Sequence, residues 1–481
     1  MQKPENYPQN LKLWDIFYDF TQIPRPSKKE EKIQKYLIDL AEDKKLEYIQ
    51  DSAGNIIIKV PGKGSRANAD SVIIQNHIDM VTDAIKGKKI DFENDPIETF
   101  VEDGWLKAKG TTLGADNGIG CACALATIFE EDLEHPPLEL LFTVDEETGL
   151  NGALGLESKY LNSKKMLNLD TEEWGSLYIG CAGGIDYELE RTFDFNKDSN
   201  QFKYELTLQG LTGGHSGVEI HEQRANAIKK LNEALFELKG HINIHSYIGG
   251  RAHNIIPRDV SVVFSSKEDI TDKINTILDS IEKRFKSYFK PEDQKFEFVL
   301  AEADDFSESL SLEDSKKLIA MINLFPHGAH SYELNSDEKL VSMSNNLAKV
   351  IMKNGNCYIQ SSLRFFDREE IKTIETELRE LGELFEFKVQ TNSEYPSWKP
   401  VRDNKLLDQV VEIYKKTFNE NPIITAIHAG LECGILRDKI GPIDVVSFGP
   451  TIMGAHSPDE RINIETVDKF WQLFKATMKE I

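Results

Sequence analysis

Cysteine, positive charge and long apolar runs are all scarce in this sequence of 481 residues, and each shortage excludes a class of protein. The five cysteines are odd in number and include no CxxC pair, which favours reduced thiols in a cytoplasm over a disulfide framework. No apolar run approaches the roughly 18 residues that a membrane-spanning helix needs. The N-terminal residues also lack the charged-then-apolar pattern of a secretory signal, so we expect none.

The net charge is −24, because acidic residues outnumber basic ones. Nucleic acids and anionic membranes both require a positive surface, so neither is an expected partner. Solubility alone is a sufficient reason for such a charge. Hydrophobic residues make up 40% of the chain and charged residues 29%, which is a globular composition and not a disordered one. The length exceeds what one hydrophobic core serves, so we expect two domains.

Short apolar runs that end in polar residues are the main pattern along the chain. Runs this short and continuous are typical of central strands covered on both faces, and helical segments such as 119–129 lie between them. Alternating strands and helices predict an α/β sheet, in which sites form beyond the carboxyl ends of the strands. The runs are Val72–Ile74 before His77, Leu138–Val144 before Glu146 and Glu147, Met166–Leu169 before Asp170, and Val445–Phe448 before the loop that contains His456.

The pattern changes near residue 186. Strands in the segment 201–395 alternate polar and apolar residues and the helices are long, which indicates an α+β domain with helices on one sheet face. The α/β pattern returns at Trp398. We therefore predict a discontinuous α/β/α domain formed by residues 1–185 and 398–481, with an α+β domain inserted at 186–397.

Two local patterns give more detailed expectations. Ser27 followed by Glu30 is a capping-box signature at the start of a helix that contains Ile33 and Leu37. The alternating segment 385–389 predicts a strand.

Five residues from five separate segments have the chemistry of zinc-class ligands: His77, Asp116, Glu147, Asp170 and His456. The helical motif HExxH is absent from the sequence, so a metal site would have to be assembled from distant segments. Taken singly, each residue also has a structural explanation, such as a hydrogen-bonded core histidine, an N-cap aspartate or a solvated turn.

Neighbouring residues suggest further roles. Asp79 follows His77 at a spacing that puts both on the same side of extended chain, where it can accept the second N–H of the imidazole. Glycines surround Asp116 and leave the room that a carboxylate bridging two cations needs. Glu146 and Glu147 are adjacent acids at a strand end, so one can bind a metal while the other acts as a general base.

The combined pattern resembles one family. In order and approximate spacing, the motifs are similar to those of the zinc metallopeptidase family M20, and within it to the aminoacyl-histidine dipeptidase (peptidase D) branch. The resemblance covers nearly the whole chain. The matching segments are IPRPS at 23–27, HIDMV at 77–81, GADNG at 114–118, DEETG at 145–149, LNLD at 167–170, GGHSG at 213–217, RANA at 224–227, HAGLECG at 428–434 and GAHSP at 454–458.

This resemblance implies two divalent metal ions per chain, with Zn²⁺ the first choice and Co²⁺ or Mn²⁺ as alternatives. His77 and Asp170 would hold one ion, Glu147 and His456 the other, and Asp116 would bridge both.

The resemblance also implies catalytic and substrate-binding roles. Glu146 would be the general base, Asp79 would orient His77, and His215 of the inserted domain would polarise the scissile carbonyl. The substrate contacts would be Asn254, Arg364 and Gly430, with Arg364 binding the free carboxylate of a dipeptide.

The implied protein is a cytoplasmic homodimer that hydrolyses dipeptides of the Xaa-His type, including β-alanyl-histidine, with broad specificity. Residues 1–185 and 398–481 would form the catalytic metal-binding domain, and the inserted domain would serve as lid and dimerisation domain. An N-acyl amino acid deacylase with the same metal core is the alternative enzyme. A non-catalytic zinc-binding protein is the alternative from another class, and the intact Glu146 and ligand set argue against it.

Overall fold

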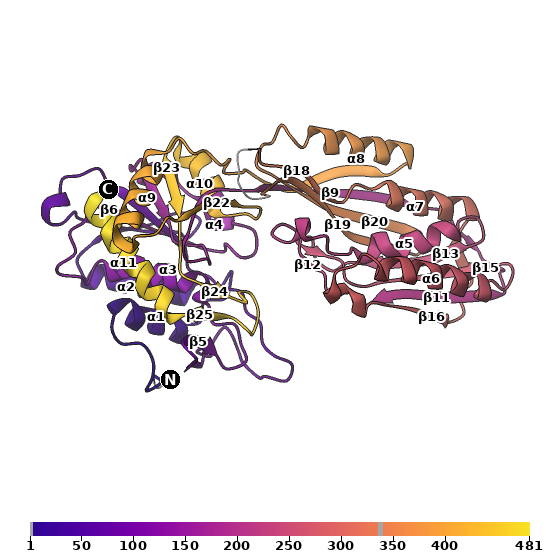
Figure 1. The fold of residues 1–481 in the computed structure, drawn as a ribbon, viewed down its shortest axis with the longest axis horizontal. Coiled ribbons are helices and arrows are strands. Elements are labelled where there is room, and N and C mark those ends of the chain that lie inside the picture. Colours follow the sequence, from indigo (N-terminus) through magenta and orange to yellow (C-terminus); the bar gives the residue numbers. More distant parts are fainter. Residues whose placement is uncertain (1–2, 335–339) are drawn as a thin grey trace. The chain divides into compact units, whose positions relative to one another are not determined.

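The computed structural model describes residues 3–334 and 340–481 and divides into two compact units. Unit 1 comprises Met1–Cys181, Trp398–Ala426 and Leu431–Ile481, and unit 2 comprises Ala182–Ser397 and Ile427–Gly430. Both units appear in Figure 1. Within the described ranges, no helix is both long and apolar enough to cross a bilayer.

Unit 1 is built on a sheet with the strand order β1-β2-β6-β3-β7-β23-β8-β22. The neighbours β6, β3, β7 and β23 run parallel, so their carboxyl ends lie at one edge. Every residue of β3 and β6 is buried, which shows that both faces of this part of the sheet are covered. The strands are β1 (Glu47–Gln50), β2 (Ile56–Val60), β3 (Val72–His77), β6 (Leu138–Thr143), β7 (Lys165–Asn168), β8 (Ser176–Cys181), β22 (Ile423–Ile427) and β23 (Asp444–Ser447).

A second sheet of unit 1 has the order β24-β25-β5-β4. Its strands are β4 (Thr99–Glu102), β5 (Trp105–Ala108), β24 (Ile452–Met453) and β25 (Arg461–Asn463). The antiparallel pair β24 and β25 holds the loop 454–460, which includes His456. The helices of unit 1 are α1 (Lys12–Gln22), α2 (Glu31–Asp43), α3 (Ala115–Ala126), α4 (Asn151–Gly155), α9 (Lys405–Phe418), α10 (Glu432–Ile440) and α11 (Ile464–Glu480), with 3₁₀ turns at Gly64–Arg66 and Ser158–Tyr160.

Unit 2 is built on a largely antiparallel sheet with the order β16-β11-β15-β13-β19-β20-β9-β21, and β18 pairs with β19. Burial alternates along β11 and β15, because one face packs on helices and the other does not. The strands are β9 (Gly183–Thr192), β11 (Phe202–Gln209), β13 (Asn243–Gly249), β15 (Val260–Ser266), β16 (Glu297–Glu302), β18 (Gly328–Tyr332), β19 (Val341–Lys353), β20 (Asn356–Phe365) and β21 (Lys388–Tyr395).

The helices of unit 2 and its own core stabilise this sheet. The core includes Leu206, Phe264 and Leu347 from the strands and Leu231 and Ile322 from the helices. The remaining elements are α5 (Ala227–Glu237), α6 (Thr271–Lys286), α7 (Leu312–Leu324), α8 (Lys372–Leu384), the 3₁₀ turns Ile220–Glu222 and Pro291–Lys295, and the short paired strands β10 (Phe195–Lys197) with β17 (Glu308–Leu310) and β12 (Gly214–His215) with β14 (Ile255–Ile256). The predicted α/β fold is confirmed.

Two local predictions are wrong. The N-cap of α2 is Glu30, and the side chains of the expected capping box bond elsewhere: Ser27 donates to Asp79, and Glu30 accepts from the backbone N–H of Asp145. The segment 385–389 is not a strand throughout. Phe385 is the C-cap of α8, and β21 begins only at Lys388.

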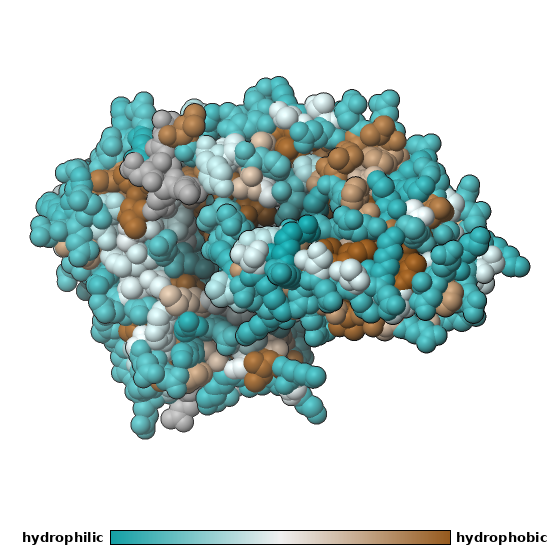
Figure 2. Space-filling view, turned by 45° about the vertical axis from the view of Figure 1, so that its right-hand side comes forward, coloured by the Kyte–Doolittle hydropathy of each residue, from teal (hydrophilic) through white to brown (hydrophobic). Residues whose placement is uncertain are grey.

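The molecular surface agrees with the high content of charged residues. Figure 2 shows a face that is mostly hydrophilic, with apolar residues in separate patches. Isolated exposed apolar side chains are normal on a folded protein and mark no site by themselves.

Candidate metal centre

The parallel strands of unit 1 bring three of the predicted ligands together. His77 is the last residue of β3 and lies opposite Thr143, the last residue of β6, while Gln75 lies opposite Asn168 at the end of β7. The chain continues from β6 to Glu146 and Glu147, and from β7 to Asp170. Side chains from three carboxyl ends therefore meet at one edge of the sheet.

The other two predicted ligands come from a turn and a loop. Asp116 lies in the first turn of α3, where its backbone is non-helical and its peptide bond to Asn117 is cis. The carboxylate of Glu460 accepts hydrogen bonds from the backbone N–H groups of four consecutive residues, at 2.6 Å from Leu113, 2.9 Å from Gly114, 2.7 Å from Ala115 and 3.3 Å from Asp116. Because Glu460 and His456 share the loop 454–460, this clamp fixes that loop to the turn that carries Asp116.

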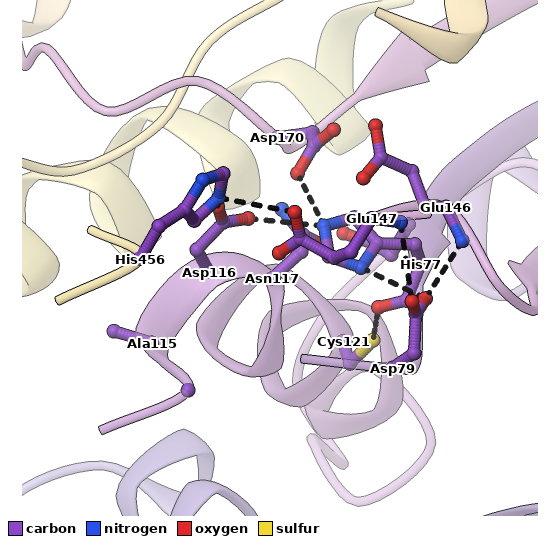
Figure 3. Close-up of polar contacts among 12 residues, drawn as sticks. His77, Asp79, Ala115, Asp116, Asn117, Cys121, Glu146, Glu147, Asp170 and His456 are labelled. Carbon is purple, nitrogen blue, oxygen red and sulfur yellow. Dashed lines mark hydrogen bonds and ion pairs between the residues drawn. The ribbon is translucent and has the colours of Figure 1, made fainter. Parts of the chain in front are cut away.

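Asp116 lies between two histidines, as Figure 3 shows. Its Oδ1 is 3.0 Å from Nε2 of His77, which is also 3.3 Å from Oδ1 of Asp170. Its Oδ2 is 3.0 Å from Nε2 of His456, which is also 3.1 Å from Oε2 of Glu147. The five residues thus form two groups. Each group has one imidazole and one carboxylate of its own, and the carboxylate of Asp116 belongs to both groups.

Asp79 lies on the far side of the His77 ring. Its Oδ1 is 3.4 Å from Nδ1 of His77, and it also accepts hydrogen bonds from the backbone N–H groups of Glu146 and Glu147, at 3.1 and 3.2 Å. Burial favours a neutral Asp79, but the contacts with His77, the N–H of Glu146 and the hydroxyl of Ser27 outweigh it and lower the pKa. An ionised Asp79 therefore orients His77 and the two glutamates together.

Carboxylates outnumber the groups that can carry positive charge at this centre. Burial raises the pKa of Asp170 to about 6 and also raises the pKa of Glu147, with the charge of Asp116 contributing to both shifts. Burial acts against charge on His77, yet Asp170, Asp116 and Asp79 outweigh it and raise the pKa of His77 well above its usual range. In the metal-free protein the histidines are thus held as cations by the carboxylates around them.

The donor set fits divalent metal ions. The ligand atoms of His77, Asp116 and Asp170 lie within 4.8 Å of one another, and so do those of Asp116, Glu147 and His456. Oε1 of Glu147 is a buried atom that has no hydrogen-bond partner among the described residues, so its lone pairs are available to a metal ion. Imidazole with carboxylate is a donor set of zinc-class metals, and a cation would replace the positive charge that these carboxylates need.

Glu146 has a different environment from its neighbour. Its carboxylate points toward that of Asp170 in Figure 3 and away from Asp79. Burial raises the pKa of Glu146 well above its usual range; His77 opposes that shift, while Glu147 and Asp170 add to it. A carboxylate made more basic in this way suits a general base near neutral pH.

Unit 2 carries the other predicted site residues. Nδ1 of His215 accepts hydrogen bonds from the backbone N–H groups of Gly217 at 3.2 Å and Val218 at 3.0 Å. Two backbone donors require Nδ1 to be an acceptor, so the neutral ring carries its hydrogen on Nε2 and can donate from there. Asn254 lies beside this segment, because its carbonyl accepts from the N–H of Ser216 at 2.8 Å.

Arg364 and Gly430 meet at Tyr395. Nη1 of Arg364 donates to the hydroxyl of Tyr395 at 3.2 Å, and a Cβ atom on Gly430 would lie 3.1 Å from the same ring. Burial lowers the pKa of His428 well below its usual range, and the nearby charges of Arg364 and His215 lower it further. Unit 2 therefore gathers all four of its predicted site residues into one neighbourhood around His428 and Tyr395.

Several residues of the centre were missed in the sequence. Arg25 is buried and donates to the backbone carbonyls of Ile78 at 3.0 Å, Asp79 at 2.8 Å and also Gly114, which ties β3 to the turn before Asp116. Arg25 lies in the segment 23–27 and Glu460 follows the segment 454–458, both of which carried the family resemblance. Both residues therefore lay within or beside segments that were already singled out. They were missed because a buried charged residue that bonds to the backbone has no characteristic sequence spacing to its partners.

Comparisons with known proteins point to one peptidase family. Residues 73–480 match the family model described as peptidase family M20/M25/M40. The chain is 36% identical over 477 residues to the cytosol non-specific dipeptidase of Escherichia coli K12, covering 98% of this chain and 97% of that protein. The crystal structure of aminoacylhistidine dipeptidase from Vibrio alginolyticus aligns with a TM-score of 0.81 and 33% identity, over 97% of this chain and 96% of the other. Aminopeptidase PepT from Bacillus cereus aligns with a TM-score of 0.56 and 16% identity over 97% of both chains, a likeness of fold alone.

Proposed function

Because the chain belongs to peptidase family M20/M25/M40, we propose that it is a two-metal dipeptidase that cleaves dipeptides of the Xaa-His type, including β-alanyl-histidine, with broad specificity. The observation that carries the proposal is the division of Asp116 between two groups, one with His77 and Asp170 and one with His456 and Glu147. A single ion would not need two such groups.

The ions would be held by His77 and Asp170 on one side and by Glu147 and His456 on the other, with Asp116 as the shared ligand. When bound, they would lower the pKa of a water molecule and polarise the scissile carbonyl. We take Zn²⁺ as the first choice of metal, because imidazole and carboxylate are usual ligands of catalytic zinc; Co²⁺ and Mn²⁺ accept the same ligands.

Glu146 acts as the proton carrier of the reaction. Its raised pKa lets it take a proton from the attacking water near neutral pH and return that proton to the leaving amine. Asp79 keeps its charge and holds both His77 and the backbone of Glu146 in place.

The residues of unit 2 bind the substrate. The Nε2–H of His215 donates to the carbonyl oxygen as negative charge develops on it. Arg364 binds the free carboxylate of the dipeptide, and Asn254 and Gly430 contact its backbone. We further propose that unit 2, as an inserted lid and dimerisation domain, makes the protein a homodimer, and that the protein works in the cytoplasm, as the name of the Escherichia coli relative indicates for that protein.

A dipeptide panel tests this function. The metal-reconstituted protein should hydrolyse Xaa-His dipeptides and β-alanyl-histidine, and a chelator should abolish the activity until Zn²⁺, Co²⁺ or Mn²⁺ is returned. N-acetyl amino acids serve as the comparison, because the deacylase alternative uses the same metal core on those substrates. Hydrolysis of N-acetyl amino acids without hydrolysis of dipeptides would overturn the proposal, and so would full dipeptidase activity in Glu146→Gln.

A further inference from the structure

Glu432, the first residue of α10, is a fully buried carboxylate to which the mechanism gives no role. Its Oε2 lies 2.6 Å from Nε2 of Gln75 and 2.5 Å from Oγ1 of Thr143. Gln75 is on β3 just before His77, and Thr143 ends β6 just before Glu146. A single carboxylate therefore touches two of the strands that carry the metal centre.

The contact continues across the sheet. Nδ2 of Asn168 donates to Oε1 of Gln75 at 2.5 Å, and Oδ1 of Asn168 accepts from the hydroxyl of Ser447 and from the backbone N–H of Asp170 at 3.3 Å. Gln75, Asn168 and Ser447 are direct partners in the register of β3, β7 and β23. All of these side chains are fully buried, so the row is closed to water.

The backbone fixes which end of each amide side chain in this row donates and which end accepts. The N–H of Asp170 can only donate, so Asn168 must present its oxygen there and its NH₂ to Gln75. Gln75 must then present its oxygen to Asn168 and its NH₂ to Glu432. Each amide in the row has one permitted orientation, and Oε2 of Glu432 is an acceptor at the end of it.

The hydrogen bonds of the Thr143 hydroxyl indicate the protonation state of Glu432. It has one hydrogen but lies within hydrogen-bond distance of two acceptors, the carbonyl of Asn76 at 3.1 Å and Oε2 of Glu432 at 2.5 Å. If Oε2 of Glu432 carries a proton, it can donate to Oγ1 of Thr143 and still accept from Gln75, and Thr143 can then donate to Asn76, so the one hydrogen of Thr143 no longer has to serve two acceptors. Burial raises the pKa of Glu432 to about 8, which agrees with the protonated form near neutral pH.

We propose that Glu432 is a positioning residue of the metal centre: as a neutral carboxylic acid it donates to Thr143 and accepts from Gln75, and so holds the ends of β3, β6 and β7 at the spacing that the metal ligands need. The inference rests on the metal-binding part of the proposed function and not on the substrate. Without this group, the NH₂ of Gln75 and the hydroxyl of Thr143 lose a buried partner, and the strands lose their common anchor.

Three variants test the role through metal binding. The measurements are Zn²⁺ affinity by competition with a chromophoric chelator and the visible absorption spectrum of the Co²⁺-loaded protein. Glu432→Gln can present an oxygen that accepts from Gln75, but from that same position it has no hydrogen to donate to Thr143, so affinity between that of the unmodified protein and that of Glu432→Ala is expected. Glu432→Ala should weaken binding about 10- to 100-fold and change the spectrum, as loss of a supporting contact does in other metal sites. Thr143→Val, which keeps the volume and removes the hydroxyl, should weaken binding severalfold, and it remains informative if Glu432→Ala does not fold.

Glu139→Ala is the matched control. Glu139 is also buried on β6, but it lies at the opposite end of that strand, where it accepts from the N–H and the hydroxyl of Ser163. This variant should lower the thermal unfolding temperature of the metal-free protein and leave metal affinity unchanged.

Two results would overturn the inference. If Glu432→Ala and Thr143→Val weaken metal binding no more than Glu139→Ala does, Glu432 has only a structural role. If Glu432→Gln binds metal as tightly as the unmodified protein, an acceptor alone is enough at this position and a protonated Glu432 is not what the site requires. Failure of the proposed dipeptidase function would appear as normal metal binding without turnover in the unmodified protein, and it would leave these affinities as they are.

Discussion

Asp116 and His456 meet through Oδ2 and Nε2 at 3.0 Å, while the other carboxylate oxygen of Asp116 is 3.0 Å from His77. This arrangement predicts different metal contents for two variants. Asp116→Ala removes a ligand from both groups, so it should retain less than about one ion per chain after dialysis. His456→Ala affects one group and should retain about one ion. Metal analysis of dialysed protein checks this, and equal losses in the two variants would contradict the shared role of Asp116.

Glu146→Gln should separate catalysis from metal binding. The amide cannot accept the proton of water, so kcat should fall about 10²- to 10⁴-fold or more. Metal content should stay at the level of the unmodified protein, because Glu147 and not Glu146 lies near His456. Steady-state kinetics and metal analysis on the same preparation make the test. A variant that loses its metal along with its activity would show that Glu146 is a ligand instead.

Metal binding at neutral pH should release protons. Burial opposes charge on His456, but its contacts with Asp116 and Glu147 outweigh burial and raise its pKa to about 12 in the metal-free protein. The stabilisation from this protonated ring is complete below about 6.5, the unfolded pKa, and is lost as the pH rises toward 12. A metal must displace that proton from the folded protein, so metal affinity should increase with pH throughout the range below about 12.

Calorimetry in buffers of different ionisation enthalpy measures this release. We expect about one to two protons per chain at pH 7, and about one fewer for His456→Ala. Binding with no buffer dependence would contradict the protonated state of the metal-free centre.

Glu460 should stabilise the folded protein although it is not a metal ligand. Its carboxylate accepts from four consecutive backbone N–H groups, so Glu460→Gln would place an NH₂ against at least one of them. An unpaired buried donor costs about 1–3 kcal/mol, and the unfolding free energy should fall by that amount. Glu465→Gln is the control: this acid at the start of α11 forms only an exposed ion pair with Lys469, so its loss should have little effect on the unfolding free energy. Chemical denaturation of both variants provides the comparison.

Arg364→Ala should affect dipeptides more than their amides. If the guanidinium binds the free carboxylate of the substrate, KM for dipeptides should rise about 10- to 100-fold with a smaller effect on kcat. C-terminally amidated dipeptides lack that carboxylate and should already be poor substrates that the variant cleaves no worse. An equal loss on both substrates would place Arg364 elsewhere in the mechanism.

The sequence revealed the parts of the site that depend on parallel strands. His77, Glu147 and Asp170 each follow an apolar run, and parallel strands bring such positions to one edge without further information. Asp116 and His456 were candidates by their chemistry, but only the family resemblance joined them to the other ligands, since a bend in α3 and the loop 454–460 have no periodicity that places them.

The errors have physical causes. Ser27 and Glu30 have the spacing of a capping box, but they bond to Asp79 and Asp145 and so support the metal centre. A local rule was broken where long-range contacts offered partners to the same polar groups. Phe385 and Phe387 alternate as in a strand, yet both are buried in the core of unit 2 around the end of α8, where alternation reflects packing and not extended backbone.

The pairing of β9 with β21 has a consequence for how the chain folds. Gly184 lies opposite Tyr395, so the sheet of unit 2 brings the two ends of its main segment together. The next residues of unit 1 on either side, Cys181 and Trp398, exchange backbone hydrogen bonds at 2.8 and 3.0 Å. If the insertion folds first, it closes the long loop that separates the two halves of unit 1, and the entropy of that closure is no longer a cost to the metal-binding sheet. Folding from the middle of the chain outward is the order that this arrangement favours.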